Sequence, residues 1–434
     1  MRLTWLLPED LVAHQLVQSR AEGVDTAPYA KRWADAGGST EPLSAGTPDT
    51  PANPEQRELA RQLLAELDAL APPATEYVVP ELEPLPPATD QEARVVGGWT
   101  GRAAGCLLGK PMEGLPREGI REVLESSGQW PLRQYVTADG VPEEVLERRP
   151  WHWSHPRSLR ENLDGMPEDD DLNYAILALL LLERHGHGLT TDDVAESWLQ
   201  QLPAGRTFTA ERVAYRNLLD GVPPSRAALV GNPFREWIGA QIRTDVYGWA
   251  NPGDRTAAGR LAVVDARLSH TGAGVDGAVW VAAMSAATMA LDDAGAVVEA
   301  GLAAIPADGD LATAVRFGLD LAGRDLDDAL DALHERYGHL HWVHAVNNSA
   351  LTAYALAASG GDFGTGIVAA AVSGWDTDSV GATVGAVLGA LHGVPERWSE
   401  PLDNRIATSL PGLHGVAIDD LARRTVRCQR EVPR

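Results

Sequence analysis

The distribution of apolar residues along the chain predicts a protein built from helices. Segments rich in alanine and leucine repeat apolar residues at helical spacing. Alternating runs of valine, isoleucine and threonine, which are typical of strands, are nearly absent. The fold class predicted from this pattern is all-α. The helices are expected over residues 95–108, 171–184, 191–201, 257–269, 275–291, 310–322, 345–359 and 379–392.

The first 90 residues differ from the rest of the chain. They contain two helix-like stretches, 6–20 and 55–70, with a segment rich in Gly, Ser, Thr and Pro between them. Residues 71–90 contain six prolines, which exclude a regular helix because proline lacks a backbone N–H and clashes with the preceding turn. We therefore predict an N-terminal accessory segment, helical and proline-rich, over residues 1–90 and an all-α domain over residues 91–434.

Composition narrows the class of protein. With 434 residues, of which 44% are hydrophobic, the chain is globular and can bury a sizeable core. Its net charge of -25 disfavours nucleic acid and anionic membranes as partners. The two cysteines, Cys106 and Cys428, are too few for a disulfide framework or a cysteine-based metal site. The first residues lack the features of a signal peptide, so a cytoplasmic location is expected. The oligomeric state does not follow from the sequence.

Two acidic clusters, far apart in sequence, each precede an apolar helical stretch. The first covers residues 168–171 (Glu-Asp-Asp-Asp), and the second is Asp376-Thr377-Asp378-Ser379. The helix dipole alone accounts for one or two acidic residues at a helix start, each worth about 0.3–1 kcal/mol. It accounts poorly for carboxylates as dense as these, which repel one another unless a cation lies between them. Oxygen ligands without histidine favour Mg²⁺ or Mn²⁺ over Zn²⁺.

Four motifs in order resemble those of the ADP-ribosylglycohydrolase family. They are the glycine-rich run 98–114, the first acidic cluster, Ser269-His270-Thr271-Gly272, and residues 374–379 with the glycine-rich stretch that follows. Together they span most of residues 91–395, and residues 1–90 lie outside the resemblance. The family has a compact, orthogonal multi-helix fold, and its members hold two Mg²⁺ ions between two such acidic motifs.

The resemblance implies a role for several residues of this chain. Glu113 matches the glutamate that serves as acid or base, and Asp169 and Asp378 would also take part in catalysis. His270 and Trp375 would bind substrate. Glu168 and Ser379 stand where the family commonly has Thr, and Asp171 likewise replaces a Thr, which leaves the ligand register open by one position. The implied metal ligands are Glu168, Asp169, Asp170, Asp376, Asp378 and Ser379.

The activity implied by the resemblance is Mg²⁺-dependent hydrolysis of the N- or O-glycosidic bond at the anomeric carbon of ADP-ribose, with two Mg²⁺ ions (or Mn²⁺) as cofactors. The substrate would be an ADP-ribosylated protein or a small molecule similar to ADP-ribose. Two alternatives stay open. The same site could act on a small riboside or nucleotide, or the chain could be a non-catalytic relative that binds ADP-ribose or has a structural role.

Other residues have less specific explanations. His334, His339, His341 and His344 lack the spacing of a zinc motif, which favours packing or surface roles. Trp151 and Trp153 could stack on a base or fill a hydrophobic gap, and His270, without the resemblance, would be taken for a core or capping histidine.

Overall fold

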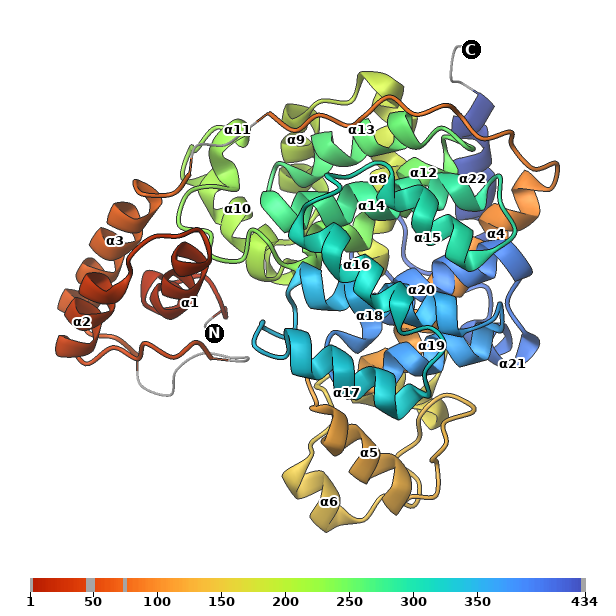
Figure 1. Cartoon of the computed structure of the whole chain (residues 1–434), viewed down its shortest axis with the longest axis horizontal. Coiled ribbons are helices and arrows are strands. Elements are labelled where there is room, and N and C mark those ends of the chain that lie inside the picture. Colours follow the sequence, from red (N-terminus) through yellow and green to blue (C-terminus); the bar gives the residue numbers. More distant parts are fainter. Residues whose placement is uncertain (1–2, 44–50, 73–75, 431–434) are drawn as a thin grey trace.

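The computed structural model describes residues 3–43, 51–72 and 76–430, and it confirms the all-α class. In the described part of the chain, sheet is confined to two strands of two residues each, β1 (Arg405–Ile406) and β2 (Val416–Ala417), which pair antiparallel. Most helices pack into one body, and α5 and α6 project from one end of it (Figure 1).

The helices agree with the predicted stretches to within a few residues at each end. Other helices were not predicted, among them the very short α7 and α11, which have too few turns to show a periodicity, and also longer ones such as α10 and α17. The first half of the chain contains α1 (Pro8–Ala21), α2 (Ala27–Asp35), α3 (Pro54–Asp68), α4 (Gln91–Gly109), α5 (Arg117–Ser126), α6 (Glu143–Arg148), α7 (His155–Ser158), α8 (Asp170–His185), α9 (Thr191–Gln201), α10 (Thr209–Leu219) and α11 (Pro224–Ala227). The second half contains α12 (Asp245–Trp249), α13 (Arg255–Ala266), α14 (Gly272–Thr288), α15 (Ala294–Leu302), α16 (Asp310–Asp320), α17 (Leu326–Tyr337), α18 (Ala345–Ala358), α19 (Phe363–Ala371), α20 (Thr377–His392), α21 (Glu396–Ser399) and α22 (Ile418–Arg430).

The N-terminal helices α1, α2 and α3 form a group beside the main body (Figure 1, left). Their apolar residues share a small core with α10 and with Phe234 and Trp237, in which the rings of Trp5 and Phe234 meet edge to face at 5.3 Å. Ion pairing adds to the contact, because Arg235 lies 2.5 Å from Glu22. The segment is therefore docked on the main body. Its status as a separate unit stays a prediction, and its predicted linker falls partly on residues 44–50 and 73–75, outside the described residues.

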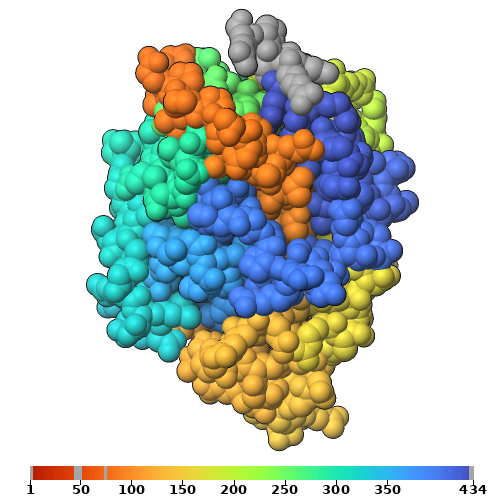
Figure 2. Space-filling view, turned by 90° about the vertical axis from the view of Figure 1, so that its right-hand side faces the viewer, coloured from red at the N-terminus to blue at the C-terminus, as the bar shows by residue number. Residues whose placement is uncertain are grey.

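Residues 76–90 run in an extended conformation over the main body, as their prolines require. The Tyr77 hydroxyl donates a hydrogen bond to Asp276 in α14 (2.7 Å), and the backbone N–H of Leu85 donates to the carbonyl of Gly253 (3.0 Å). Figure 2 shows the orange part of the chain on the surface, between green and blue parts. These bonds tie the stretch to helices that follow it by well over a hundred residues.

The close packing of α4 against α20 determines where the acidic clusters meet. Helices α4 and α20 are antiparallel, and glycines recur every fourth residue along the face that each presents to the other. A Cβ added at Gly101 would overlap the carbonyl oxygen of Gly385, and one at Gly105 would overlap that of Gly381. Only glycine permits backbones to approach so closely. The end of α4 is therefore held against the beginning of α20, where the Thr377 hydroxyl donates to the Gly109 carbonyl at 2.9 Å.

Candidate active site

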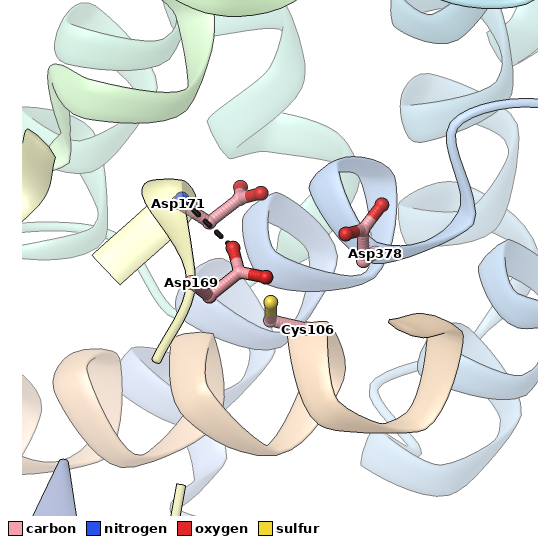
Figure 3. A group of neighbouring side chains, drawn as sticks. All are labelled: Cys106, Asp169, Asp171 and Asp378. Carbon is pink, nitrogen blue, oxygen red and sulfur yellow. Dashed lines mark hydrogen bonds between the residues drawn. The ribbon is translucent and has the colours of Figure 1, made fainter. Parts of the chain in front are cut away.

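The two acidic clusters come together at the ends of three helices. Asp378 lies in the first turn of α20, and Asp169 and Asp171 lie at the beginning of α8. Cys106 faces them from the last turn of α4 (Figure 3). One ligand atom from each of these four residues lies within 4.8 Å of all the others, and all four residues are buried. Segments about 200 residues apart in sequence thus form one buried acidic site.

Local helix geometry determines which carboxylates of the first cluster face this site. Asp169 is the N-cap of α8, and its Oδ1 accepts a hydrogen bond from the backbone N–H of Asp171 at 2.8 Å. Asp171, in the first turn, accepts a bond on Oδ2 from the Ser379 hydroxyl of α20 at 3.2 Å. The two clusters are therefore joined directly, by a hydroxyl from one helix and a carboxylate from the other.

Glu168 makes different contacts. Its Oε2 lies 3.1 Å from an Arg206 guanidinium nitrogen, and its Oε1 accepts from the Asn173 side chain at 3.2 Å. Of the predicted first ligand set, Asp169 belongs to the convergent group, whereas Glu168 and Asp170 do not. Asp171, which was not in that set, does.

Two buried cations contact the site. Lys110, in the turn after α4, forms an ion pair with Asp169 and is 4% exposed. Arg102, from the middle of α4, bridges two carboxylates, with one nitrogen 3.3 Å from Asp171 and another 2.7 Å from Asp245. Neither residue was proposed from the sequence.

Burial and mutual repulsion make these carboxyl groups hard to ionise. Burial, together with the Asp378 charge, raises the pKa of Glu113 and of Asp376 well above the usual range. Burial raises the pKa of Asp170 to about 6, because the Lys110 charge offsets it only in part. Ionised carboxylates that lie close together repel one another, and a bound cation relieves this repulsion.

Glu113 approaches the site from the loop after α4. Its Oε2 lies 3.2 Å from Nδ1 of His152, and its carboxyl interacts with Asp378. Burial lowers the pKa of His152 to about 4, so this imidazole is neutral at pH 7 and can contact Glu113 without carrying a charge.

A divalent cation fits the residues present. The donors are mainly carboxylate oxygens, which hard cations prefer, and they converge from the ends of adjacent helices. Cys106 adds a thiol to this oxygen set. The sequence suggested for it only a packing role, since an isolated cysteine gives no signal of its place in space.

The two predicted substrate-binding residues lie outside the convergent group. His270 is buried, with Nδ1 2.8 Å from the Ser269 hydroxyl and Nε2 3.9 Å from Glu211. Trp375 is also buried and stacks on the His334 ring, with 4.3 Å between centroids. Their role in substrate binding stays a prediction.

The other histidines and tryptophans singled out in the sequence have varied surroundings. His341 stacks on Trp237 at 4.1 Å, and His344 caps α18 by accepting from the backbone N–H of Val346. These are packing and capping contacts, and packing is one of the two roles expected for these histidines. Trp153 is 62% exposed.

None of the helices in residues 3–43, 51–72 and 76–430 is long and apolar enough to cross a membrane.

The fold and the site together define an all-α protein with buried carboxylates at the ends of adjacent helices. The sequence profile of the ADP-ribosylglycohydrolases matches residues 87–431, and the chain therefore belongs to the ADP-ribosylglycohydrolase family. Family membership makes hydrolase the class of enzyme to which this chain is assigned.

Two further proteins are similar to this chain. An uncharacterized protein of Archaeoglobus fulgidus is 28% identical over 325 residues, which are 72% of this chain and 94% of that protein. A solved structure, described as an ADP-ribosylglycohydrolase-related protein complex, is 21% identical with a TM-score of 0.48. It covers 79% of this chain and 100% of its own.

Proposed function

We propose that this protein is a metal-dependent hydrolase, with Mg²⁺ as the expected ion and Mn²⁺ as the alternative. It cleaves the N- or O-glycosidic bond at the anomeric carbon of ADP-ribose, in an ADP-ribosylated protein or in a small molecule of similar chemistry. The observation that supports this most strongly is the buried convergence of Asp169, Asp171 and Asp378 in a member of this family.

The residues that would hold a divalent ion are these three aspartates, with Asp376 and Ser379 beside them in sequence. When bound, the metal would orient the ribose hydroxyls and act as a Lewis acid toward them and toward water. The burial of the aspartates excludes bulk solvent from the site, which strengthens each electrostatic interaction within it.

Glu113 is the best candidate for moving a proton. Its raised pKa favours the protonated form of the carboxyl, and an acid in that form can donate to the leaving nitrogen or oxygen as the glycosidic bond breaks. The nearby His152 can hold the carboxyl in one orientation. After the leaving group departs, the Glu113 carboxylate can accept a proton from the water that adds to the anomeric carbon.

The aspartates also act on the charge that develops in the sugar. Glycoside cleavage builds positive charge at the anomeric carbon, and fixed carboxylates close to it lower the barrier. The proposal assigns this role to Asp378, in the first turn of α20, and to Asp169, the N-cap of α8. The backbone contact between α4 and α20 supports a fixed position for Asp378.

The first experiment is calorimetric titration of ADP-ribose into the protein, with Mg²⁺ and then with EDTA. Binding that depends on Mg²⁺ is expected, together with release of ADP-ribose from at least one conjugate in a panel of ADP-ribosylated arginine, ADP-ribosylated serine and a small riboside. Asp378→Asn is expected to abolish turnover while helical circular dichroism is unchanged, and Asp308→Asn, at an exposed turn, serves as the control.

Three results would contradict the proposal. The first is binding that ignores EDTA, which would indicate a protein that recognises ADP-ribose without metal chemistry. The second is full turnover in Asp378→Asn. The third is a metal-loaded protein that cleaves no member of the panel.

A further inference from the structure

The charged side chains around a second pocket, away from the acidic site, are mainly arginines. This pocket has a volume of about 480 Å³. It is lined by the later turns of α18, by α19 and α21, by the turn before α17 and by the loop between α5 and α6. These helices are labelled in the lower half of Figure 1. None of the lining residues belongs to the two acidic clusters, and Glu113 does not line the pocket.

The three arginines of this pocket are Arg133, Arg324 and Arg397, and all three are exposed. None of them forms an ion pair with another residue in the described part of the chain. The chain has 61 acidic and 36 basic residues, so a carboxylate partner is available to most arginines. Three unpaired guanidinium groups around one pocket therefore indicate that they pair with an anion from outside the chain.

A buried indole in the same pocket also lacks a partner. Trp398 is fully buried, and the ring of Tyr135 packs edge to face against it with 5.3 Å between centroids. Its Nε1–H has no hydrogen-bond partner among the described residues. Buried donors are rarely left without an acceptor, because an unpaired polar group destabilises the fold. An acceptor atom of a bound ligand would satisfy this N–H.

The indole and one of the guanidinium groups face the same point at the start of α19. Gly364 lies in the first turn of this helix. A Cβ added there would lie 3.4 Å from Nε1 of Trp398 and 2.7 Å from a terminal nitrogen of Arg397. The Arg397 guanidinium also lies 5.5 Å from the centroid of the Trp398 ring, a contact that favours this position. Glycine thus leaves open a small space that two donors face.

The lining also contains two carboxylates, Asp325 and Asp362. Asp362 is held by its own helix, because its Oδ1 accepts hydrogen bonds from the backbone N–H and the hydroxyl of Thr365, at 2.7 and 2.8 Å. Asp325 is exposed at the N-cap of α17. Three guanidinium groups against two carboxylates leave the lining with one excess positive charge, in a chain whose net charge is -25. The pocket is therefore a local exception to the charge of the molecule.

Charge and size together favour a phosphate ester as the ligand. A phosphate monoester carries a charge of about -1.5 to -2 at pH 7 and has three strong acceptor oxygens. The planar guanidinium of arginine matches such a group through paired hydrogen bonds. Apolar side chains of the lining, among them Leu132 and Val368, can contact the organic part of the ligand. The volume is in the range of small-molecule pockets.

We propose that this pocket binds a phosphorylated small molecule, whose phosphate group accepts hydrogen bonds from Arg397 and from the indole N–H of Trp398. Arg133 and Arg324 add positive charge around the phosphate. The pocket shares no residue with the acidic site, so the inference goes beyond the proposed hydrolase activity and does not depend on a bound metal.

The test is a titration of the full-length protein, labelled with ¹⁵N in its tryptophan indoles, with phenyl phosphate. EDTA in the buffer keeps divalent ions from recruiting phosphate to the acidic site. The indole resonance of Trp398, identified by its loss in Trp398→Phe, is expected to shift and to saturate, because the N–H gains an acceptor. Calorimetric titration of the same protein gives the Kd. No shift of this resonance and no heat of binding would overturn the inference.

Substitution of single arginines tests which groups hold the phosphate. Arg397→Gln should raise the Kd by about tenfold or more, since it removes a charge-assisted hydrogen bond, and Arg133→Gln and Arg324→Gln should raise it less. Arg226→Gln is the matched control, at an exposed arginine of α11 that lies outside the pocket lining, and it should leave the Kd unchanged. An unchanged Kd in Arg397→Gln would overturn the inference. If Trp398→Phe does not fold, the calorimetric comparison of these variants decides the question.

Benzoate and phenol test the chemistry of the ligand, because they carry the same ring with one negative charge and with none. Both are expected to bind more weakly than phenyl phosphate. Equal affinity for benzoate would overturn the assignment to phosphate, since a single carboxylate would then suffice. Equal affinity for phenol would show that the ring alone is bound, and it would overturn the role of the arginines.

Discussion

Among individual residues, the first acidic cluster shows how a shift of one position changes chemistry. Successive helical residues point about 100° apart, since a turn contains about 3.6 residues. With Asp169 as the N-cap, Asp171 faces the second cluster and Glu168 lies before the helix, beside Arg206. The sequence identified the cluster but did not show which of its four acidic residues is the N-cap of the helix. That choice depends on tertiary contacts, because all four side chains can cap a helix. Lys110 and Arg206 could not be predicted, since nothing near them in sequence marks their partners.

With Asp169 as the N-cap, substitutions of Asp171 and of Glu168 are expected to have different effects on metal binding. Asp171→Asn should weaken binding of the divalent ion by about tenfold or more, by analogy with the loss seen when groups that support a metal site are removed. Glu168→Gln should change it little, because the Glu168 carboxylate contacts Arg206 and Asn173. Calorimetric titration with Mn²⁺ measures both. Equal losses in the two variants would place Glu168 among the ligands.

The raised pKa values predict a dependence of stability on pH. A carboxyl whose pKa is higher in the folded than in the unfolded state stabilises the fold when protonated, and this contribution is lost as pH rises through the folded pKa. For Asp170 that interval runs from the ordinary value of 3.8 to about 6.

Metal binding requires the ionised forms, so the stabilisation that Mg²⁺ provides should grow as pH rises across the same interval. The rise in Tm on adding Mg²⁺ should be larger at pH 8 than at pH 5, as measured by differential scanning calorimetry. A shift that shrinks with rising pH would show that other groups control metal binding.

Among the elements, the pairing of α4 with α20 is the contact that positions the site. Both stretches are recognisable in the sequence as rich in glycine. Their pairing, and the antiparallel alignment that brings Gly101 to Gly385, did not follow from it, because many helices of the chain are rich in glycine or alanine. The alignment nevertheless brings the C-terminal end of α4 beside the N-terminal end of α20, and the acidic site lies at these two ends.

Gly385→Ala tests this contact. The added methyl group would overlap backbone atoms of Gly101, which cannot move aside as a side chain can. We expect a loss of about 3 kcal/mol in the free energy of unfolding, at the upper end of the usual cost of overpacking. Urea denaturation followed by circular dichroism measures it. Gly323→Ala, where no atom lies within 4 Å of the added group, should be nearly neutral. Similar values for both variants would argue against backbone contact.

In the whole molecule, α1, α2 and α3 lie outside the stretch matched by the family and form a second, smaller core together with α10, Phe234 and Trp237. This core has few apolar residues, and its contact with the main body depends on Phe234, Trp237 and the ion pair between Glu22 and Arg235. The sequence predicted two of the three helices and the proline-rich stretch. It did not predict where they dock, because the residues that receive them lie well over a hundred positions away in sequence.

Leu63→Ala tests whether this core can loosen by itself. Leu63 is fully buried in α3, and such truncations cost about 2–5 kcal/mol. Amide hydrogens of α1 and α3 should exchange faster, while those of α4 and α20 keep their protection. Leu70→Ala, at a residue 49% exposed, is the control. Faster exchange in α4 and α20 as well would mean that the two cores unfold as one.

The pairing of α4 with α20 also has a consequence for synthesis of the protein. Asp169 and Asp171 leave the ribosome about 200 residues before Asp378 and the glycines that hold it in place. Until α20 has been made, the glycine face of α4 lacks the helix that covers it, although Lys110 is already present to pair with Asp169. Contacts this distant in sequence form late and slowly. A nascent chain therefore carries an incomplete acidic site for most of its translation, and the site is complete only when α20 has folded back onto α4.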